Sequence, residues 1–178
     1  MTPRAVSDVA RSWRYSPLVI TSVRTPWRPI GVVADEDGIV IASWFGEPRE
    51  SDIAHVDISL ARKVRQIPGV TDAVRDWVDG DVDAILAVPV DQPGGDFQQR
   101  AWQAMRRVKG GTTVSYADLA RMAGNPKAVR AAGSACALNH VAPFVPCHRI
   151  IHTDGTISAY GFGPELKVTL LEHEGALL

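Results

Sequence analysis

The chain has 178 residues, of which 46% are hydrophobic and 22% charged, and its formal net charge is −1. It contains no apolar stretch of about eighteen residues, the minimum for a membrane-spanning helix, and its apolar share is too high for a disordered chain. Two cysteines cannot build a disulfide scaffold, and residues 1–15 lack the pattern of a secretory signal. We therefore expect a cytoplasmic protein that does not associate with membranes.

Basic residues are concentrated in the middle of the chain. Residues 100–150 contain eight lysines and arginines against one acidic residue, Asp118, although the whole chain is nearly neutral. Such a cluster is typical of a surface that binds a polyanion, because phosphate contacts need cations close together rather than a high overall charge. An ordinary solvated helix face has the same pattern, and charge alone leaves both interpretations open.

The first half of the chain predicts a small α+β domain over residues 1–92, with residues 1–16 as a flexible arm. Three segments have the alternation or β-branched composition of strands: residues 18–24, 29–34 and 38–45. The acidic run 35–38 lies between the last two and predicts a tight hairpin turn.

Two helices and one more strand are expected in the rest of this half. Apolar residues at helical spacing predict a helix over residues 52–66 and another over 70–78, and residues 82–90 predict a strand. The run Asp-Gln-Pro-Gly-Gly at residues 91–95 predicts a linker, so a second domain is expected over residues 93–178.

The second half is predicted to be mostly helical. Asp96 is expected to cap a first helix that ends at Gly110-Gly111, and Ser115 is expected to cap a short second one. The turn Gly124-Asn125-Pro126 then leads into a basic helix over residues 127–138. A short helix, a turn with glycine and a basic helix are typical of a helix-turn-helix that binds DNA, although a helical hairpin inside a core has the same pattern.

Small residues dominate the basic helix. They are Ala128, Ala131, Ala132, Gly133, Ser134 and Ala135. A glycine inside a helix costs about 1 kcal/mol relative to alanine, which a close approach of the backbone to a partner would explain. That partner is either a narrow groove of DNA or a tightly packed neighbouring helix, and the sequence favours neither.

The run Pro-Cys-His-Arg-Ile-Ile around Cys147 carries the strongest chemical signal. His148 and Arg149 are neighbouring cations that are expected to lower the pKa of the Cys147 thiol, and the thiolate is the form that attacks. A nucleophilic cysteine also needs a base, and that base needs an orienting partner, for which Glu172 and Glu174 are available. Adjacent side chains of a strand point to opposite faces, so His148 can serve as the base only if the backbone is irregular here.

This run resembles the Pro-Cys-His-Arg-(Val/Ile) signature of the O6-alkylguanine-DNA alkyltransferases, also called methylated-DNA–protein-cysteine methyltransferases. The resemblance extends from residue 96 to the C-terminus and rests on several motifs in matching order. They are residues 96–102, Ser115-Tyr116, residues 124–131, Asn139, Tyr160-Gly161, and Glu174 in a Leu-Leu-Glu-His-Glu run. Before residue 96 the similarity is limited mainly to residues 25–31. The resemblance implies an α+β fold with a small N-terminal domain of ribonuclease-H-like type and a mostly helical C-terminal domain that contains the helix-turn-helix.

The reaction is also implied by this resemblance. Cys147 would take the alkyl group from O6-alkylguanine in duplex DNA, and also from O4-alkylthymine, and would be consumed in a single turnover. His148 would act as its base through a water molecule, with Glu174 holding the imidazole. Asn139 would organise the turn around the cysteine, and Tyr116 would donate a proton to the leaving purine. No cofactor and no metal are expected.

The resemblance further implies binding from the minor groove, with the damaged base flipped out of the duplex. Arg130 would fill the space that this base leaves. The other residues expected to contact DNA are Ser115, Lys127, Ala128, Ala131 and Gly133. The residues expected to line the base pocket are Pro146, Ile150, Gly155, Ser158, Ala159, Tyr160, Gly161 and Phe162.

Three departures from the family pattern carry expectations of their own. Phe162 stands where small residues are common, and its ring is expected to narrow the pocket and disfavour bulky adducts. Residues 136–138 read Cys-Ala-Leu instead of a more polar run, and His140 replaces a frequent proline, so the preference for lesion or for DNA sequence is expected to differ. The first half lacks the cysteines that bind zinc in some members, so no zinc is expected there. No apolar stripe indicates a dimer, so we expect a monomer.

Two other classes of function remain open at this point. A cysteine hydrolase would use Cys147, His148 and Glu174 as a triad and would turn over. A non-catalytic DNA-binding protein or regulator would use the cysteine as a sensor. A zinc site built from the two cysteines, Cys136 and Cys147, with His148 and His152 has a spacing that fits no common site.

Overall fold

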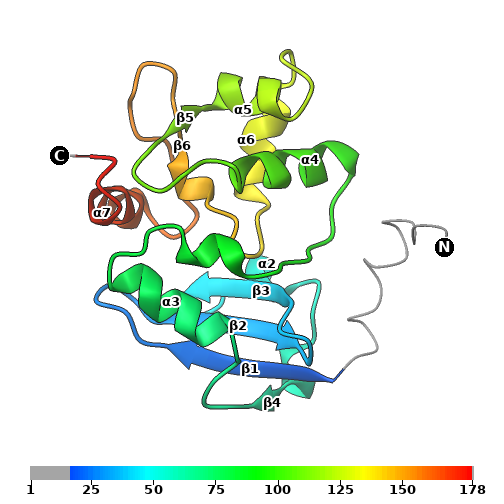
Figure 1. The fold of residues 1–178 in the computed structure, drawn as a ribbon. Coiled ribbons are helices and arrows are strands. Elements are labelled where there is room, and N and C mark those ends of the chain that lie inside the picture. Colours follow the sequence, from blue (N-terminus) through cyan, green and yellow to red (C-terminus); the bar gives the residue numbers. More distant parts are fainter. Residues whose placement is uncertain (1–16, 178) are drawn as a thin grey trace, which may run out of the picture.

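The computed structural model describes residues 17–177, and the arm predicted for residues 1–16 lies outside this range. A four-stranded sheet forms one half of the molecule, and helices around a two-stranded sheet form the other half (Figure 1). The fold is therefore of the mixed α+β class that the sequence predicts. Within the described residues no helix combines the length and the apolar character that crossing a membrane requires.

The predicted hairpin is confirmed. Three strands form an antiparallel meander: β1 (Leu18–Val23), β2 (Ile30–Asp35) and β3 (Val40–Phe45). The turn between the last two is held by the Asp35 carboxylate, which accepts hydrogen bonds from the backbone N–H groups of Asp37 (3.0 Å) and Ile39 (2.9 Å). Gly38 supplies the left-handed backbone conformation, φ 77°, that closes this turn.

The helix predicted over residues 52–66 is wrong. The segment contains three short elements: α2 (Glu50–Ile53), a 3-10 turn (Ile58–Leu60) and strand β4 (Arg62–Lys63). Strand β4 pairs in parallel with β1, and the backbone N–H of Val64 donates to the carbonyl of Ile20 at 3.0 Å. Leu60, expected on the buried side of the helix, is 75% exposed. Sheet pairing therefore outweighs the helical spacing of the apolar residues.

The helix predicted over residues 70–78 is confirmed as α3 (Val70–Val78). It lies across one face of the sheet (Figure 1) and buries Val74 and Trp77 completely. This packing places the indole of Trp77 between the sheet and the second half of the chain, where it takes part in the site described below.

The strand predicted over residues 82–90 is wrong in most of its length. Residues Ala84–Ala87 form a 3-10 turn, and Val90 forms an isolated bridge to Val40 of β3. Ile85 and Val88 are both buried, and a spacing of three residues places side chains on the same side of a 3-10 turn. Apolar content alone did not distinguish this arrangement from a strand.

The second half contains the three predicted helices, which are α4 (Asp96–Met105), α5 (Tyr116–Met122) and α6 (Val129–Ala137), and they are followed by a further helix, α7 (Pro164–His173). The small sheet pairs β5 (Val114–Ser115) in parallel with β6 (Ile150–Ile151). Ser115 caps α5 as predicted, because its hydroxyl accepts a hydrogen bond of 3.0 Å from the N–H of Asp118.

The predicted ends of two helices require correction. Gly95, not Asp96, is the N-cap of α4, and α4 ends at Met105, before the two glycines. Helix α6 begins at Val129, so the residues expected to open it lie in the turn instead. Asn125 is the physical reason, since its side chain accepts a bond from Lys127 N (3.2 Å) and its carbonyl accepts one from Ala128 N (3.0 Å). These bonds close the turn before the helix begins.

Strand β3 also holds the backbone that leads to Cys147. Ser43 donates from its N–H to the carbonyl of His140 (2.9 Å) and from its hydroxyl to the carbonyl of Ala142 (2.7 Å). Residues 140–142 therefore run along the edge of the sheet, and the first half of the chain fixes the start of the loop that carries the cysteine.

Gly31 of β2 tests the packing of the sheet. A Cβ at this position would overlap the indole of Trp44, its cross-strand neighbour, so Gly31→Ala is expected to lower the free energy of unfolding by about 1–3 kcal/mol. Gly133→Ala in α6 is the matched control, because its Cβ meets no described atom within 4 Å and alanine favours a helix. Urea unfolding measures both variants, and a Gly31→Ala protein as stable as the wild type would contradict the packing.

Candidate active site

Cys147 lies on a 3-10 turn (Cys147–Arg149) directly before β6, and Pro146 precedes it. The irregular backbone expected between the cysteine and His148 is therefore confirmed. Since β6 pairs with β5 of the helical half, this turn is fixed from the helical side as well as from the edge of the sheet.

Asn139 connects the loop to the thiol. Its side-chain amide donates to the carbonyl of Val145 (2.8 Å) and to Cys147 Sγ (3.2 Å). Its amide oxygen accepts bonds from Val141 N (3.2 Å) and from Gln92 Nε2 (3.1 Å). All four hydrogen-bonding positions of this buried amide are thus used, and the loop that ends at the cysteine is held rigidly around it.

Cys147 as a residue is 6% exposed, and burial raises the pKa of its thiol. The hydrogen bond from Asn139 and the charges of Lys167 and Arg49 oppose this effect without reversing it. The expected lowering of the pKa by adjacent cations is therefore wrong, because burial outweighs the nearby charges and the guanidinium of Arg149 bonds to a carboxylate elsewhere. The resting cysteine is a neutral thiol in a setting that stabilises its thiolate once a base has acted.

His148 has a buried carboxylate partner. Its Nε2 lies 3.0 Å from Glu174 Oε1, at the C-terminal end of α7, whereas Glu172 is exposed. The other ring nitrogen, Nδ1, has no hydrogen-bond partner among residues 17–177. The sequence left open whether Glu172 or Glu174 orients the histidine, and the structure shows that it is Glu174. Nδ1 is the ring atom that remains available to accept a proton.

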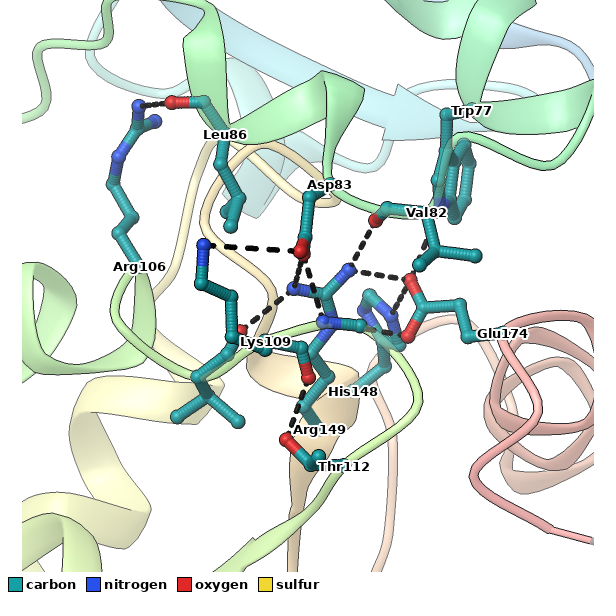
Figure 2. A network of polar contacts seen from close by, with 12 residues as sticks. Trp77, Val82, Asp83, Leu86, Arg106, Lys109, Thr112, His148, Arg149 and Glu174 are labelled. Carbon is teal, nitrogen blue, oxygen red and sulfur yellow. Dashed lines mark hydrogen bonds and ion pairs between the residues drawn. The ribbon is translucent and has the colours of Figure 1, made fainter.

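Glu174 accepts hydrogen bonds from three side chains, as Figure 2 shows. Besides His148, Trp77 Nε1 donates to it at 3.0 Å, and Arg149 donates from Nε (2.9 Å) and Nη2 (2.7 Å). Burial alone would raise the pKa of Glu174, but the charges and hydrogen bonds of His148 and Arg149 lower it to about 2. The carboxylate is therefore ionised throughout the neutral range.

His148 itself stays neutral near pH 7. The ring has no exposed surface, and burial lowers its pKa although Glu174 acts in the opposite direction. A neutral imidazole with one nitrogen held by a carboxylate has the state that a general base requires.

Arg149 ties this site to the other half of the molecule (Figure 2). Its guanidinium donates to the carbonyls of Val82 (2.7 Å) and Val108 (2.8 Å) and lies 3.5 Å from the carboxylate of Asp83. Trp77 and Asp83 were not expected from the sequence, because both lie in the half that carries no catalytic motif.

A cavity of about 490 Å³ opens beside the cysteine, within the usual size range for a bound small molecule. It is lined by Tyr116, Gly133, Cys136, Ala137, Cys147, His152, Ser158, Ala159, Tyr160, Gly161 and Lys167. Among the described residues no three metal-binding side chains come together, so the structure offers no basis for the zinc alternative.

Three polar groups form a chain along one wall of the cavity. The hydroxyl of Tyr116 lies 2.5 Å from Ser158 Oγ, which accepts a bond of 2.7 Å from Lys167 Nζ. Lys167 is 1% exposed and also donates to the carbonyl of Ile150 at 2.5 Å. Burial raises the pKa of Tyr116 and lowers that of Lys167. Lys167 was not expected from the sequence, and its place on the buried side of α7 was the available signal.

The pocket residues named from the sequence divide into two groups. Ser158 to Gly161 line the cavity, whereas Pro146, Ile150 and Gly155 lie outside its lining. Phe162 also lies outside, because its ring packs against Phe45 of β3, with 5.3 Å between centroids. The expectation that this ring narrows the cavity is corrected, since Phe162 stands behind Tyr160 rather than in the pocket.

Helix α6 has two different small-residue faces. Ala132 and Ala135 are fully buried against the neighbouring helices, whereas Gly133 lines the cavity with Cys136 and Ala137. Close packing thus explains one face and the cavity explains the other. The residues expected to contact DNA at and before this helix are placed as follows: Lys127, Arg130 and Ala131 are exposed, and Ser115 and Ala128 are half-buried.

Known proteins are similar in sequence to this chain. Residues 96–176 match the family described as 6-O-methylguanine DNA methyltransferase, DNA binding domain. A methylated-DNA–protein-cysteine methyltransferase of Shigella flexneri is 32% identical over 167 residues, which cover 90% of this chain and 98% of that protein. The bifunctional transcriptional activator/DNA repair enzyme Ada of Escherichia coli is 38% identical over 143 residues, 80% of this chain but 38% of that longer protein.

The fold is shared with a solved structure as well. Mycobacterium tuberculosis OGT in complex with DNA superposes with a TM-score of 0.68 and 29% identity, over 87% of this chain and 91% of that chain. These similarities group the chain with DNA repair methyltransferases. It belongs to the family of methylated-DNA–protein-cysteine methyltransferases, so the resemblance found in the sequence is confirmed.

The buried pair of His148 and Glu174 predicts that the folded protein is less stable in acid. Glu174 has a pKa of about 2 in the folded protein against an ordinary 4.5, so its stabilising effect is complete above pH 4.5 and is lost as the pH falls toward 2. The lowered pKa of His148 acts in the same direction below its ordinary 6.5, because the unfolded chain takes up a proton that the buried ring does not. The free energy of unfolding is therefore expected to fall below about pH 6.5 and more steeply below about pH 4.5.

Urea titrations between about pH 7 and pH 3 measure this dependence. Glu174→Gln removes the ionisable carboxyl group but keeps its size, so the steep decline below the ordinary pKa of 4.5 is expected to weaken in this variant. An identical pH slope in the wild type and the variant would contradict the assignment.

Proposed function

We propose that this protein repairs O6-alkylguanine, and also O4-alkylthymine, in duplex DNA by transferring the alkyl group irreversibly to Sγ of Cys147. One observation carries the proposal: the cysteine lies on a cavity large enough for a nucleobase, next to a buried histidine–carboxylate pair, with α6 at the wall. Family membership supports the reaction, and the individual residue roles are argued from the contacts above.

The base in this proposal is His148. The thiol proton passes to Nδ1 through a bridging water, and the Cys147 thiolate forms a bond to the alkyl carbon while the carbon–O6 bond breaks. Glu174 fixes the ring through Nε2 and stabilises the imidazolium that forms. The product is a thioether. Water does not attack its alkyl carbon to release the Cys147 thiolate, so each protein molecule acts once.

The guanine keeps the electron pair of the broken carbon–O6 bond, so its negative charge must be neutralised by a proton. In this proposal Tyr116 donates a proton to a ring nitrogen of the guanine, and the proton that His148 took from the thiol reprotonates the Tyr116 phenolate through solvent. The hydroxyl of Tyr116 is a donor at neutral pH because burial raises its pKa, and its contact with Ser158 keeps it at the cavity wall. A buried polar wall thus faces the base that leaves.

DNA would be engaged by α5 and α6 as a helix-turn-helix, with α6 in the minor groove. Exposed Arg130 would enter the base stack in place of the flipped nucleotide, and Gly133 would let the sugar–phosphate backbone approach the cavity. The open space next to Gly133 and the absence of acidic residues on α6 support this orientation.

The remaining features of the proposal concern the whole chain. The sheet order β3-β2-β1-β4, with two antiparallel pairs and one parallel pair, supports a ribonuclease-H-like first domain. The domain division between residues 92 and 93, a monomeric state and a cytoplasmic location stay predictions from the sequence.

Intact-mass analysis tests the reaction. After incubation with a duplex that contains O6-methylguanine, one methylene unit is expected on the Cys147 peptide, with one equivalent per protein molecule and none in Cys147→Ser. Continued release of product by a fixed amount of protein would instead indicate a hydrolase. Binding of the duplex without any mass gain would indicate a non-catalytic DNA-binding protein.

Arg130→Ala tests base flipping. The variant is expected to repair duplex DNA at least about tenfold more slowly, because unstacking a base costs a few kcal/mol that the arginine would offset. Repair of a single-stranded substrate is expected to change less. Arg121→Ala on α5, which removes an exposed arginine paired with Asp118, is the control. Equal loss on both substrates, or in both variants, would contradict the role.

A further inference from the structure

Two arginines of the sheet half reach across to the wall of the cavity. Arg28, in the loop between β1 and β2, donates to the carbonyl of Phe162 at 2.9 Å. Arg49, at the start of α2, donates to the preceding carbonyl, that of Gly161. Two successive peptide groups next to Tyr160 are therefore held by side chains from the other half of the molecule.

The guanidinium of Arg49 is fixed in this position. Asp52, a carboxylate that is 2% exposed, accepts bonds from Arg49 Nε (3.0 Å) and Nη2 (2.5 Å). The same guanidinium lies 4.2 Å from the centre of the Phe162 ring, in a cation–π contact. At Gly161, an added Cβ would lie 2.6 Å from Arg49 Nη1, so glycine is what permits this close approach.

Aromatic contacts extend this anchor into the cavity. The Phe162 ring packs edge-on against Phe45 at 5.3 Å and against Tyr160 at 5.5 Å between centroids. Tyr160 and Gly161 line the cavity itself. A continuous series of contacts thus leads from buried Asp52 through Arg49 and Phe162 to Tyr160, which lines the same cavity as Cys147.

We propose that Arg49 is a positioning residue for alkyl transfer, which holds the 160–162 segment from the sheet half and so sets the shape of the wall of the cavity that contains the acceptor cysteine. This inference rests on the proposed function and goes beyond it, because it assigns part of the pocket to the domain that carries no catalytic motif. The positive charge of Arg49 has a second effect: it opposes the rise in the pKa of the Cys147 thiol that burial causes.

Three variants separate the contributions of shape and charge. Arg49→Met keeps the unbranched apolar stem of the side chain and removes the guanidinium, with its charge and its hydrogen bonds. Arg49→Lys keeps the charge but not the planar group that bonds Asp52 and stacks on Phe162 at the same time. Arg75→Met is the matched control, because Arg75 is also paired with an aspartate three residues away, Asp72, on the exposed surface of α3.

Single-turnover alkyl transfer at saturating duplex DNA is the main measurement. Arg49→Met is expected to be about tenfold slower or more, because small misplacements around reacting groups cost large factors in rate. Its duplex affinity is expected to stay within about twofold, since no phosphate contact is lost. The pH midpoint of the rate is expected to rise in Arg49→Met and to return toward the wild-type value in Arg49→Lys, which remains slow. Arg75→Met is expected to match the wild type throughout.

Hydrogen exchange provides a readout that does not depend on catalysis. Faster exchange of amides in residues 158–163 is expected in both Arg49 variants, with β1 to β3 unchanged. Wild-type transfer rates and unchanged exchange in Arg49→Met would overturn the inference, and so would an equal effect of Arg75→Met. Failure of the wild-type protein itself to take up an alkyl group would overturn the proposed function instead, while the exchange measurement still tests the contact.

Discussion

A single buried carboxylate, that of Glu174, is bonded by side chains from both halves of this protein. Glu174 is ionised inside the structure, and an isolated buried charge of this kind would cost several kcal/mol. Hydrogen bonds from His148, Arg149 and Trp77 compensate this cost, and the donors come from the cysteine turn and from the helix on the sheet. The base of the proposed reaction is therefore oriented by the same contacts that join the halves, so catalysis and stability depend on one network.

Neutral His148 and neutral Cys147 fit this arrangement. Burial opposes the charged form of each, while Lys167 and Arg49 favour the thiolate and Glu174 favours the imidazolium. A thiol that stays protonated until a substrate arrives is less exposed to oxidation than a permanent thiolate, because reactivity follows thiolate character and access. In the proposed single-turnover reaction, this restraint preserves the acceptor thiol of Cys147.

Much of the helical half could be predicted from the sequence, because local signals there agree with the fold. Ser115 caps its helix, the Pro-Cys-His-Arg run marks the reactive turn, and the order of motifs identifies the family. The helix predicted over residues 52–66 failed because parallel pairing of β4 with β1 is a long-range effect that local periodicity does not contain. The roles of Lys167 and Arg49 were missed for the same reason, since each depends on partners distant in the chain.

The bonds from Ser43 to residues 140–142 carry a consequence for how the molecule comes apart. The glycine-rich stretch at residues 91–95 separates the two halves in sequence. In space, however, residues 140–142 of the second half lie along β3, the edge strand of the sheet. Separating the two halves would remove the hydrogen-bond acceptors of Ser43. It would also expose apolar surface that is buried where the halves meet. The change in composition at residues 91–95 therefore does not divide the structure into independent parts. We expect the described residues to unfold in one cooperative transition.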